Sequence, residues 1–297
     1  MNMKNTVLLV VFLMLGGLVL IMSGDTEPEA FSPVAVDTLA DAHGFSVDLS
    51  DKESLYIANH NGLYRLLDEA TLERISEAQH DFMGFAAHPA DPKVMYASGH
   101  PKTGGNLGVL KSTDGGQTFE KISDGAQGPV DFHAMTISDA NPLYLYGSYT
   151  GTFQRSIDGG VTWEITNGPA NTNIISLTAD VEDQDTVYAS TSTGIFVSTD
   201  AGDSWEKYYG ESAVIAFAIN PNNPSERIAS FAESGLLRSI DDGESWNQMT
   251  SPSESSVPVL YIDFAGDESN TVFALLQDLS IHSTTNEGAT WKTIHKN

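Results

Sequence analysis

Aspartate and histidine are the residues of this chain whose types and spacing could form a reactive or binding site. Asp41 and His43 are separated by one residue, and Asp131 and His133 repeat that spacing. Asp81 stands in a related segment between these two pairs. The chain contains 8 histidines and no cysteine. A metal site or an acid–base site must therefore be built from imidazole and carboxylate groups.

A repeated motif indicates the framework that must position these residues. The pattern S-x-D-x-G-x-[ST]-[WF] occurs four times, and a fifth copy has Asn for Asp and Thr for Ser. Its key positions are Asp114, Asp158, Asp200, Asp241 and Asn286, at steps of 44, 42, 41 and 45 residues. That period is typical of propeller blades. A short carboxylate can accept hydrogen bonds from turn N–H groups and glycine supplies positive φ, so each copy predicts a structural turn between two strands.

Six related units follow from residue 41 to residue 297, each with four predicted strands. Second strands rich in Val and Tyr recur, for example at 55–58 and 187–190. Third strands are expected to begin at glycines, namely Gly62, Gly108, Gly151, Gly194 and Gly235. The fold class predicted from this pattern is all-β, a six-bladed β-propeller of four-stranded blades, whose radial closure leaves only short sheet edges exposed.

The first strand of each unit alternates large and small residues. The large set is Phe45, Phe85, Met135, Leu177 and Phe217, and the small set is Gly44, Gly84, Ala134, Ser176 and Ala216. Because neighbouring residues of a strand point to opposite faces of the sheet, we expect a large side chain of one blade to meet a small residue of the next.

The candidate site residues belong to units one to three. Inner strands of a propeller start at one rim of the central channel, and the loops that join second to third strands open on the same rim. Units four and five carry Asn173 and Ala213 where the first three units carry aspartate. The residues expected to meet in one sector of this rim are Asp41, His43, His60, His80, Asp81, His100, Asp131 and His133.

A divalent metal site is one interpretation of this sector. Imidazole nitrogen and carboxylate oxygen bind zinc, manganese and related ions when thiols are absent. The candidate metal ligands are His43, His133 and Asp81.

A metal-free ligand site is a second interpretation, in which carboxylates act as acid and base in glycosidic cleavage while imidazoles orient the sugar. The candidate catalytic residues are then Asp41, Asp81 and Asp131, and the candidate ligand-binding residues are His60, His80 and His100. In a third interpretation these groups only satisfy strand-end backbone atoms and line a wet channel. His88 is expected in a turn, and His282 and His295 on the surface of the last blade.

The repeated motif resembles the Asp-box, or BNR repeat, of sialidases, sortilin-type receptors and many bacterial glycosyl hydrolase-like proteins. The segments 80–85, 98–101, 107–116 and 131–135 resemble Bacillus-type exported glycosyl hydrolase-like propellers, and the likeness covers residues 41–291. It implies a propeller whose Asp-box turns lie on the face away from the active site, and it implies no defined reaction. Sialidase activity is not expected, because Arg65, Arg155 and Arg238 stand beside the boxes and no arginine starts an inner strand, whereas sialidases bind their substrate with three arginines.

Charge and the N-terminal segment restrict partners and location. Forty acidic against 14 basic residues give a net charge of −26, which excludes nucleic acid as an expected partner. Residues 1–22 contain an apolar run behind Lys4 and predict an N-terminal transmembrane helix or signal segment. Residues 23–40 are expected to form an acidic tether before the propeller at 41–297.

Two function classes follow from these features. The first is an extracytoplasmic glycosyl hydrolase-like propeller with a His/Asp-lined ligand site, which as an enzyme would be glycosidase-like or a metal-assisted hydrolase. The alternative is a non-catalytic cell-surface scaffold that binds a protein or glycan. We expect a monomeric ectodomain on a single-pass membrane protein, or a secreted protein if the N-terminal segment is cleaved.

Overall fold

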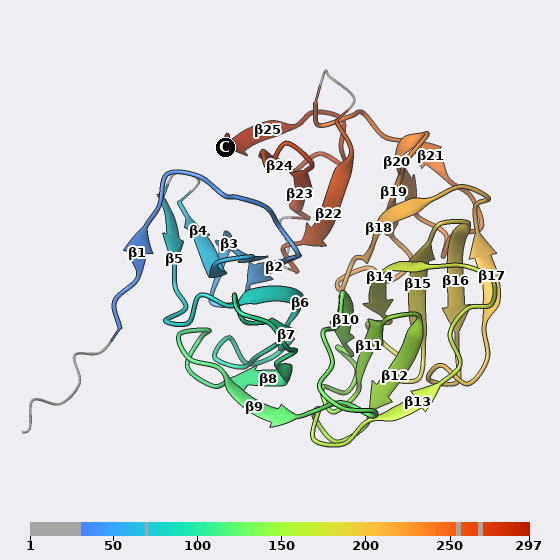
Figure 1. The fold of residues 1–297 in the computed structure, drawn as a ribbon. Helices are drawn as coiled ribbons and strands as arrows, with labels where there is room; N and C mark the ends of the chain where they lie inside the picture. The colour runs from blue at the N-terminus through green and yellow to red at the C-terminus, as the bar shows by residue number, and fades with distance from the viewer. Residues whose placement is uncertain (1–30, 69–70, 254–256, 267–269) are drawn as a thin grey trace, which may run out of the picture. The chain divides into compact units, whose positions relative to one another are not determined.

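Six antiparallel sheets follow one another along the chain, each built from one continuous stretch of sequence (Figure 1). The computed structural model describes residues 31–68, 71–253, 257–266 and 270–297. The predicted N-terminal helix or signal segment at 1–22 lies outside the described residues. Within the described ranges, no helix is long and apolar enough to cross a membrane.

The strands occupy equivalent places in the six sheets. The inner strands are β2 (Gly44–Asp48), β6 (Asp81–Ala87), β10 (Ala134–Ile137), β14 (Ile174–Ala179), β18 (Val214–Ile219) and β22 (Val259–Phe264). The second strands are β3 (Asp51–Asn59), β7 (Met95–His100), β11 (Leu145–Tyr149), β15 (Val187–Thr191), β19 (Arg227–Phe231) and β23 (Val272–Leu276). The third strands are β4 (Gly62–Leu67), β8 (Gly108–Ser112), β12 (Thr152–Ser156), β16 (Gly194–Ser198), β20 (Gly235–Ser239) and β24 (Ile281–Thr284). The outer strands are β5 (Thr71–Arg74), β9 (Glu120–Ser123), β13 (Glu164–Thr166), β17 (Glu206–Tyr209), β21 (Asn247–Gln248) and β25 (Lys292–His295).

Each inner strand contacts the inner strands of the two neighbouring sheets, and β2 contacts β22, so the ring closes. The predicted six-bladed propeller of four-stranded blades is therefore confirmed. Four of the third strands begin at the predicted glycine, and β12 begins one residue after Gly151. Blade one has an additional outer strand, β1 (Val34–Ala35), which pairs with β5 through Val34 and Arg74. Its sheet thus begins inside the segment 23–40 that was expected to be a tether.

The expected contact between small and large residues joins neighbouring blades. A Cβ atom at Gly44 would lie 2.6 Å from the Phe85 Cβ, and one at Gly84 would lie 3.2 Å from the Met135 Cβ. These distances are below ordinary van der Waals contact, so the absence of a side chain lets the inner strands approach closely. The alternation of large and small residues in the sequence therefore corresponds to contacts between neighbouring blades.

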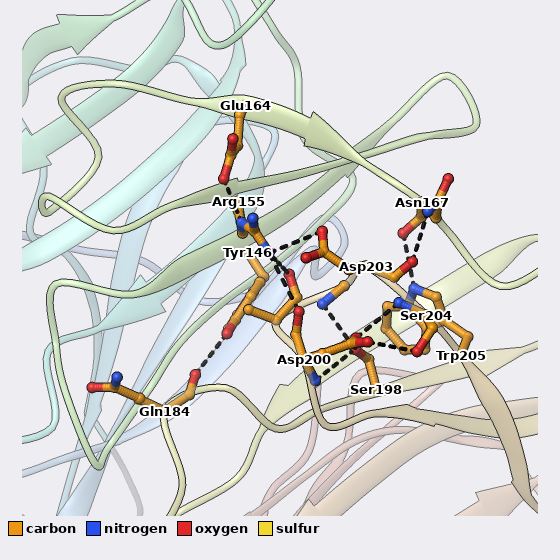
Figure 2. A network of polar contacts seen from close by, with 12 residues as sticks. Tyr146, Arg155, Glu164, Asn167, Gln184, Ser198, Asp200, Asp203, Ser204 and Trp205 are labelled. Carbon is orange, nitrogen blue, oxygen red and sulfur yellow. Dashed lines mark hydrogen bonds and ion pairs between the residues drawn. The ribbon is translucent and has the colours of Figure 1, made fainter.

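The Asp-box turn of blade four, between β16 and β17, is held by its own side chains (Figure 2). Ser198 Oγ donates to Asp200 Oδ1 at 2.8 Å, and the Ser204 amide donates to the same oxygen at 2.8 Å. The Ser204 hydroxyl donates to Asp200 Oδ2 at 2.6 Å, and this bond is the main cause of the lowered pKa of Asp200. Equivalent hydrogen bonds surround Asp114, Asp158, Asp241 and Asn286.

Arg155 of β12 links blade three to this box (Figure 2). Its Nη1 donates to the backbone oxygen of Ala201 at 3.1 Å and pairs with Asp203 at 3.2 Å, while its Nε pairs with Glu164 at 2.5 Å. An arginine beside the box thus has a structural role on the outer part of the propeller.

The seam between blade six and blade one is closed by side-chain to backbone hydrogen bonds. The side chain of Asn297 accepts from the Leu39 amide at 2.5 Å and donates to the Leu39 carbonyl at 2.9 Å. Asp263 Oδ2 of β22 accepts from the Val47 amide of β2 at 2.9 Å. Burial raises the pKa of Asp263 to about 6.

Candidate functional site

The inner strands enclose a channel of about 250 Å³. His43 and His133, at the start of inner strands, contribute to its lining, as do Asp139 and Asp263 from the opposite end of such strands. The rim at which the inner strands start is the one expected to carry the site.

Blade one contributes Asp41, His43 and His60. The backbone holds His43 just before β2, where its amide donates to the Ala58 carbonyl at 2.9 Å. His60 lies in the turn between β3 and β4, and its amide donates to Asp41 Oδ1 at 3.0 Å. The His60 Nδ1 atom contacts Asp41 Oδ2 directly, and the Nε2 atoms of His43 and His60 lie 2.8 Å apart. One ligand atom from each of the three residues lies within 4.8 Å of the others.

Blade two contributes Asp81 and His100, which are paired in the β6–β7 register. Asp81 Oδ2 lies 3.3 Å from His100 Nε2 and 3.4 Å from His60 Nε2. Asp81 therefore connects the histidines of blades one and two. Its other oxygen, Oδ1, is buried and has no hydrogen-bond partner among the described residues.

Blade three contributes Asp131 and His133. Asp131 Oδ2 lies 3.6 Å from His133 Nε2, while Asp131 Oδ1 is buried with no hydrogen-bond partner in the described structure. Burial raises the pKa of Asp131, although the nearby His133 and His100 act in the opposite direction. The His133 ring lies 6.4 Å from the ring of Tyr149.

The carboxylates form the base of the site and the imidazoles its open side. Asp81 and Asp131 are 8% and 6% exposed, whereas the side chains of His60 and His133 are 47% and 61% exposed. Burial is the main cause that lowers the pKa of His43, which favours the neutral imidazole that a metal ion requires.

The cluster contains two kinds of spacing: His43 Nε2 and His60 Nε2 at 2.8 Å and the direct contact of His60 with Asp41 suit hydrogen bonds, whereas four carboxylate–imidazole pairs are wider. The carboxylate–imidazole distances at His43, His60, His100 and His133 are 3.7, 3.4, 3.3 and 3.6 Å, longer than typical hydrogen bonds of about 2.7–3.2 Å. They are close to the roughly 3.4 Å edge of a tetrahedron with metal–ligand bonds of about 2.0–2.1 Å. The contact of Asp41 with His60 Nδ1 has the arrangement by which a carboxylate orients a ligating histidine.

Seven of the eight predicted site residues are brought together, and His80 is the exception. Its ring lies 6.1 Å from that of Phe82 in an edge contact, and within the described ranges it makes no hydrogen bond or ion pair with the group. The sequence interpretation missed Tyr149, whose hydroxyl accepts from Asn106 Nδ2 at 2.8 Å. Tyr149 ends β11, beside a loop that joins a second to a third strand, and such loops were already recognised as part of this rim.

The remaining histidines lie elsewhere. His88 is in a turn, where its Nδ1 accepts from the amides of Ala90 and Asp91 at 3.1 Å. The prediction that His282 lies on the surface was wrong. His282 is 6% exposed, and its Nε2 lies 2.9 Å from Ser280 Oγ. Its partners satisfy both ring nitrogens, since Thr293 Oγ1 lies 3.2 Å from Nδ1.

Residues 193–297 match the family model Sortilin-Vps10, described as "Sortilin, neurotensin receptor 3". No curated protein sequence matches the chain significantly. This match covers the last three Asp-box copies of the chain.

Several solved structures are similar in fold. An ancestral GH74 enzyme has a TM-score of 0.61 at 16% identity, over 89% of this chain and 39% of that one. The GH74 xyloglucanase from Xanthomonas campestris has a TM-score of 0.60 at 16% identity, over 89% and 56%. The extracellular domain of BT4673 from B. thetaiotaomicron has a TM-score of 0.55 at 14% identity, over 82% and 32%. This chain thus spans 39% to 56% of the two hydrolases, and at such identities the likeness establishes the fold alone.

Proposed function

We propose that this six-bladed Asp-box propeller, related in fold to GH74 glycoside hydrolases and sortilin-like domains, binds a divalent metal ion at the channel rim. The observation that carries the proposal is the convergence of Asp41, His43 and His60, which each offer one ligand atom within 4.8 Å of the others. Two imidazoles and a carboxylate form a ligand set typical of zinc, and manganese is the related alternative.

The ion would supply Lewis-acid polarisation of a bound ligand oxygen or water. Asp131, whose burial raises its pKa, would hold or accept a proton on the same rim, beside His133. Asp41 would keep the His60 ring in its binding orientation. The combined site would support metal-assisted hydrolysis of a glycan, as an extracytoplasmic glycosyl hydrolase-like protein. The location outside the cell follows from the apolar segment 6–22 of the sequence and belongs to the proposal.

Binding without catalysis is the second candidate, with a cell-surface protein or glycan as the ligand. The exposure of the His133 side chain, 61%, favours it, because catalytic centres usually shield their reacting groups from bulk solvent. The metal ion would then anchor the ligand on an open rim.

The test is the metal content of the purified full chain by inductively coupled plasma mass spectrometry. The parent is measured beside a His43→Ala/His60→Ala double variant and a His80→Ala control, with circular dichroism to verify folding. His80 lies on the same rim outside the cluster, so the control should retain the ion. Near-stoichiometric metal in the parent and control, with loss in the folded double variant, supports the site. Equal trace metal in all three overturns it.

A further inference from the structure

A pocket lies between blades two and three, at the end of the strands where the Asp-box turns are found. Its volume is about 430 Å³, within the range of about 300–1,000 Å³ that small-molecule sites occupy. Blade two contributes strand residues such as Tyr96 and Lys111, and blade three contributes its Asp-box turn and the loop that carries Leu143. Among the described residues that line it, none belongs to the His/Asp cluster of the rim. The pocket is therefore separate from the proposed metal site.

Blade three exposes aliphatic side chains beside this pocket where other blades are polar. Leu143, Ile157 and Val161 are 53%, 54% and 57% exposed, and Leu143 and Val161 line the pocket. The Gly159 amide donates to the Leu143 carbonyl, and the equivalent hydrogen bonds of blades two, four and five end at Lys93, Asp185 and Ser225. The place of Val161 is taken in those blades by Gln117, Asp203 and Glu244. The turn itself does not require apolar residues here, so their gathering indicates a surface that binds an apolar group.

The Tyr96 hydroxyl is a polar group of the pocket without a partner. Tyr96 is only 2% exposed, yet its hydroxyl makes no hydrogen bond with any residue that the structure describes. Tyr56 and Tyr146 stand at the same register position of blades one and three, and each donates to an oxygen of the protein, at 2.9 and 2.6 Å. A Cβ at Gly159 would lie 3.6 Å from both the Tyr96 oxygen and Leu143 Cδ2. Because buried polar groups nearly always have a partner, this hydroxyl indicates a ligand that accepts a hydrogen bond.

The other free polar groups of the pocket are also donors. Lys111 Nζ lies 5.2 Å from the centroid of the Tyr96 ring and has no ion-pair partner in the described ranges. His88 Nδ1 accepts from two backbone amides at 3.1 Å, so the neutral imidazole carries its proton on Nε2 and can donate it. Burial lowers the pKa of His88, Asp91 opposes this, and the positive charge of Lys111 adds to the lowering. The oxygens of Asp158 already accept hydrogen bonds within its own turn.

We propose that this pocket binds a small apolar carboxylate, a molecule with a hydrocarbon body and one acid group. The acid group accepts hydrogen bonds from Tyr96, Lys111 and His88, and the body packs against Leu143 and Val161. Hydrogen bonds between an ammonium and a carboxylate are roughly twice as strong as those between neutral groups. A second copy of this chain is not the occupant, because two molecules of net charge −26 repel one another.

The experiment is a calorimetric titration of the full chain with phenylpropionate and with its amide, which has nearly the same shape and no charge. We expect saturable binding of the acid and about tenfold weaker binding of the amide. Lys111→Met should weaken binding of the acid by about tenfold, and Tyr96→Phe by about fivefold. Lys207→Met is the matched control and should bind like the parent, because Lys207 also lies over a ring, at 5.8 Å from the centroid of Phe196, but pairs with Glu211. Circular dichroism verifies that each variant is folded.

A second variant removes the apolar wall and keeps the turn. Leu143→Ser/Val161→Gln introduces the residues that blades five and two carry at these places, and it should abolish binding of the acid. No saturable binding by the parent overturns the proposal, as does equal affinity for acid and amide, or for the parent and either Lys111→Met or the double variant. Tighter binding of a peptide that ends in phenylalanine would assign the pocket to a protein partner and overturn the small-molecule ligand. None of these outcomes bears on the metal content of the rim.

Discussion

The Nε2 atoms of His43 and His60 face one another at 2.8 Å. Two imidazoles can meet at this distance when one donates a proton to the other, or when both bind one cation. They cannot both be protonated there without repulsion, and both burial and His60 lower the pKa of His43. Burial therefore favours the neutral form of His43, although the nearby Asp41 acts in the opposite direction.

Metal addition should stabilise the protein in a pH-dependent way. A ligand that binds only the folded state raises the unfolding temperature, and protons compete with metal for imidazole. We expect zinc to raise the unfolding temperature at pH 7.5 and to have little effect at pH 5, measured by scanning calorimetry. His43→Ala/His60→Ala should show no zinc effect at either pH. An equal shift in the parent and the double variant would place the binding elsewhere.

Without metal, the lowered pKa of His43 has its own consequence. Folding favours the neutral form of His43. The contribution of His43 to the stability of the folded protein is therefore complete above the unfolded pKa of 6.5, and it is lost as the pH falls through the lower pKa of the folded state. The free energy of unfolding should decrease from pH 7.5 to pH 5, as measured in urea with a chelator present. His43→Gln should weaken this dependence; an unchanged slope would argue against burial of a neutral imidazole.

The close contact between blades one and two predicts that one added methyl group at Gly44 strongly lowers the stability of the protein. Gly44→Ala places a Cβ 2.6 Å from the Phe85 Cβ and 3.2 Å from the Ala58 Cβ, and such overpacking typically costs about 1–3 kcal/mol. Gly168→Ala is the matched control, because its Cβ would meet only the Phe153 Cβ at an ordinary 3.6 Å. Urea denaturation measures both variants, and similar stability of the two would contradict the close approach of these strands.

The hydrogen bonds of the Asp-box predict that the shape of the Asp200 side chain contributes more to stability than its negative charge does. Asp200→Ala removes the acceptor of the Ser204 amide and hydroxyl, for a loss of about 1–2 kcal/mol. Asp200→Asn should lose less, because Asn286 occupies the same place in blade six and accepts from the Thr290 amide at 3.0 Å. Thermal unfolding of the two variants is the measurement. An asparagine variant as unstable as the alanine variant would show that the charge itself is required.

The opposite end of the channel should respond to pH in the opposite sense. Asp139 lines the channel and is exposed to solvent there, yet desolvation by the surrounding channel wall raises its pKa to about 6, and the negative charge of Asp263 adds to the rise. Because the folded state favours the protonated carboxyl, the contribution of Asp139 to stability is complete below the unfolded pKa of 3.8. That contribution is lost as the pH rises through the folded pKa of about 6. Asp139→Asn should therefore increase the free energy of unfolding at pH 8 and leave it nearly unchanged at pH 4. A gain at both pH values would assign the effect to something other than charge.

The sequence was sufficient to predict the blades and the rim because both are consequences of the repeat. Gly62 and Gly194 begin third strands with φ of 118° and 126°, a region that side chains disfavour, so glycine marks the strand start. Equivalent positions in the repeat reach the same rim, which brought Asp41, Asp81 and Asp131 together.

Features outside the repeat could not be predicted in this way. The added strand β1 has no counterpart in the other blades, and the burial of His282 depends on Ser280 and Thr293, which are unique to blade six. The side-chain direction of His80 likewise depends on its contact with Phe82 and not on its place in the motif.

The most direct test of the account is anomalous diffraction from crystals of the zinc-loaded protein, recorded on both sides of the zinc edge. We expect an anomalous peak at about 2.0–2.1 Å from His43 Nε2 and His60 Nε2, beside Asp41. A direct hydrogen bond between the two imidazoles with no anomalous peak at the rim, in crystals grown with excess zinc, would contradict it.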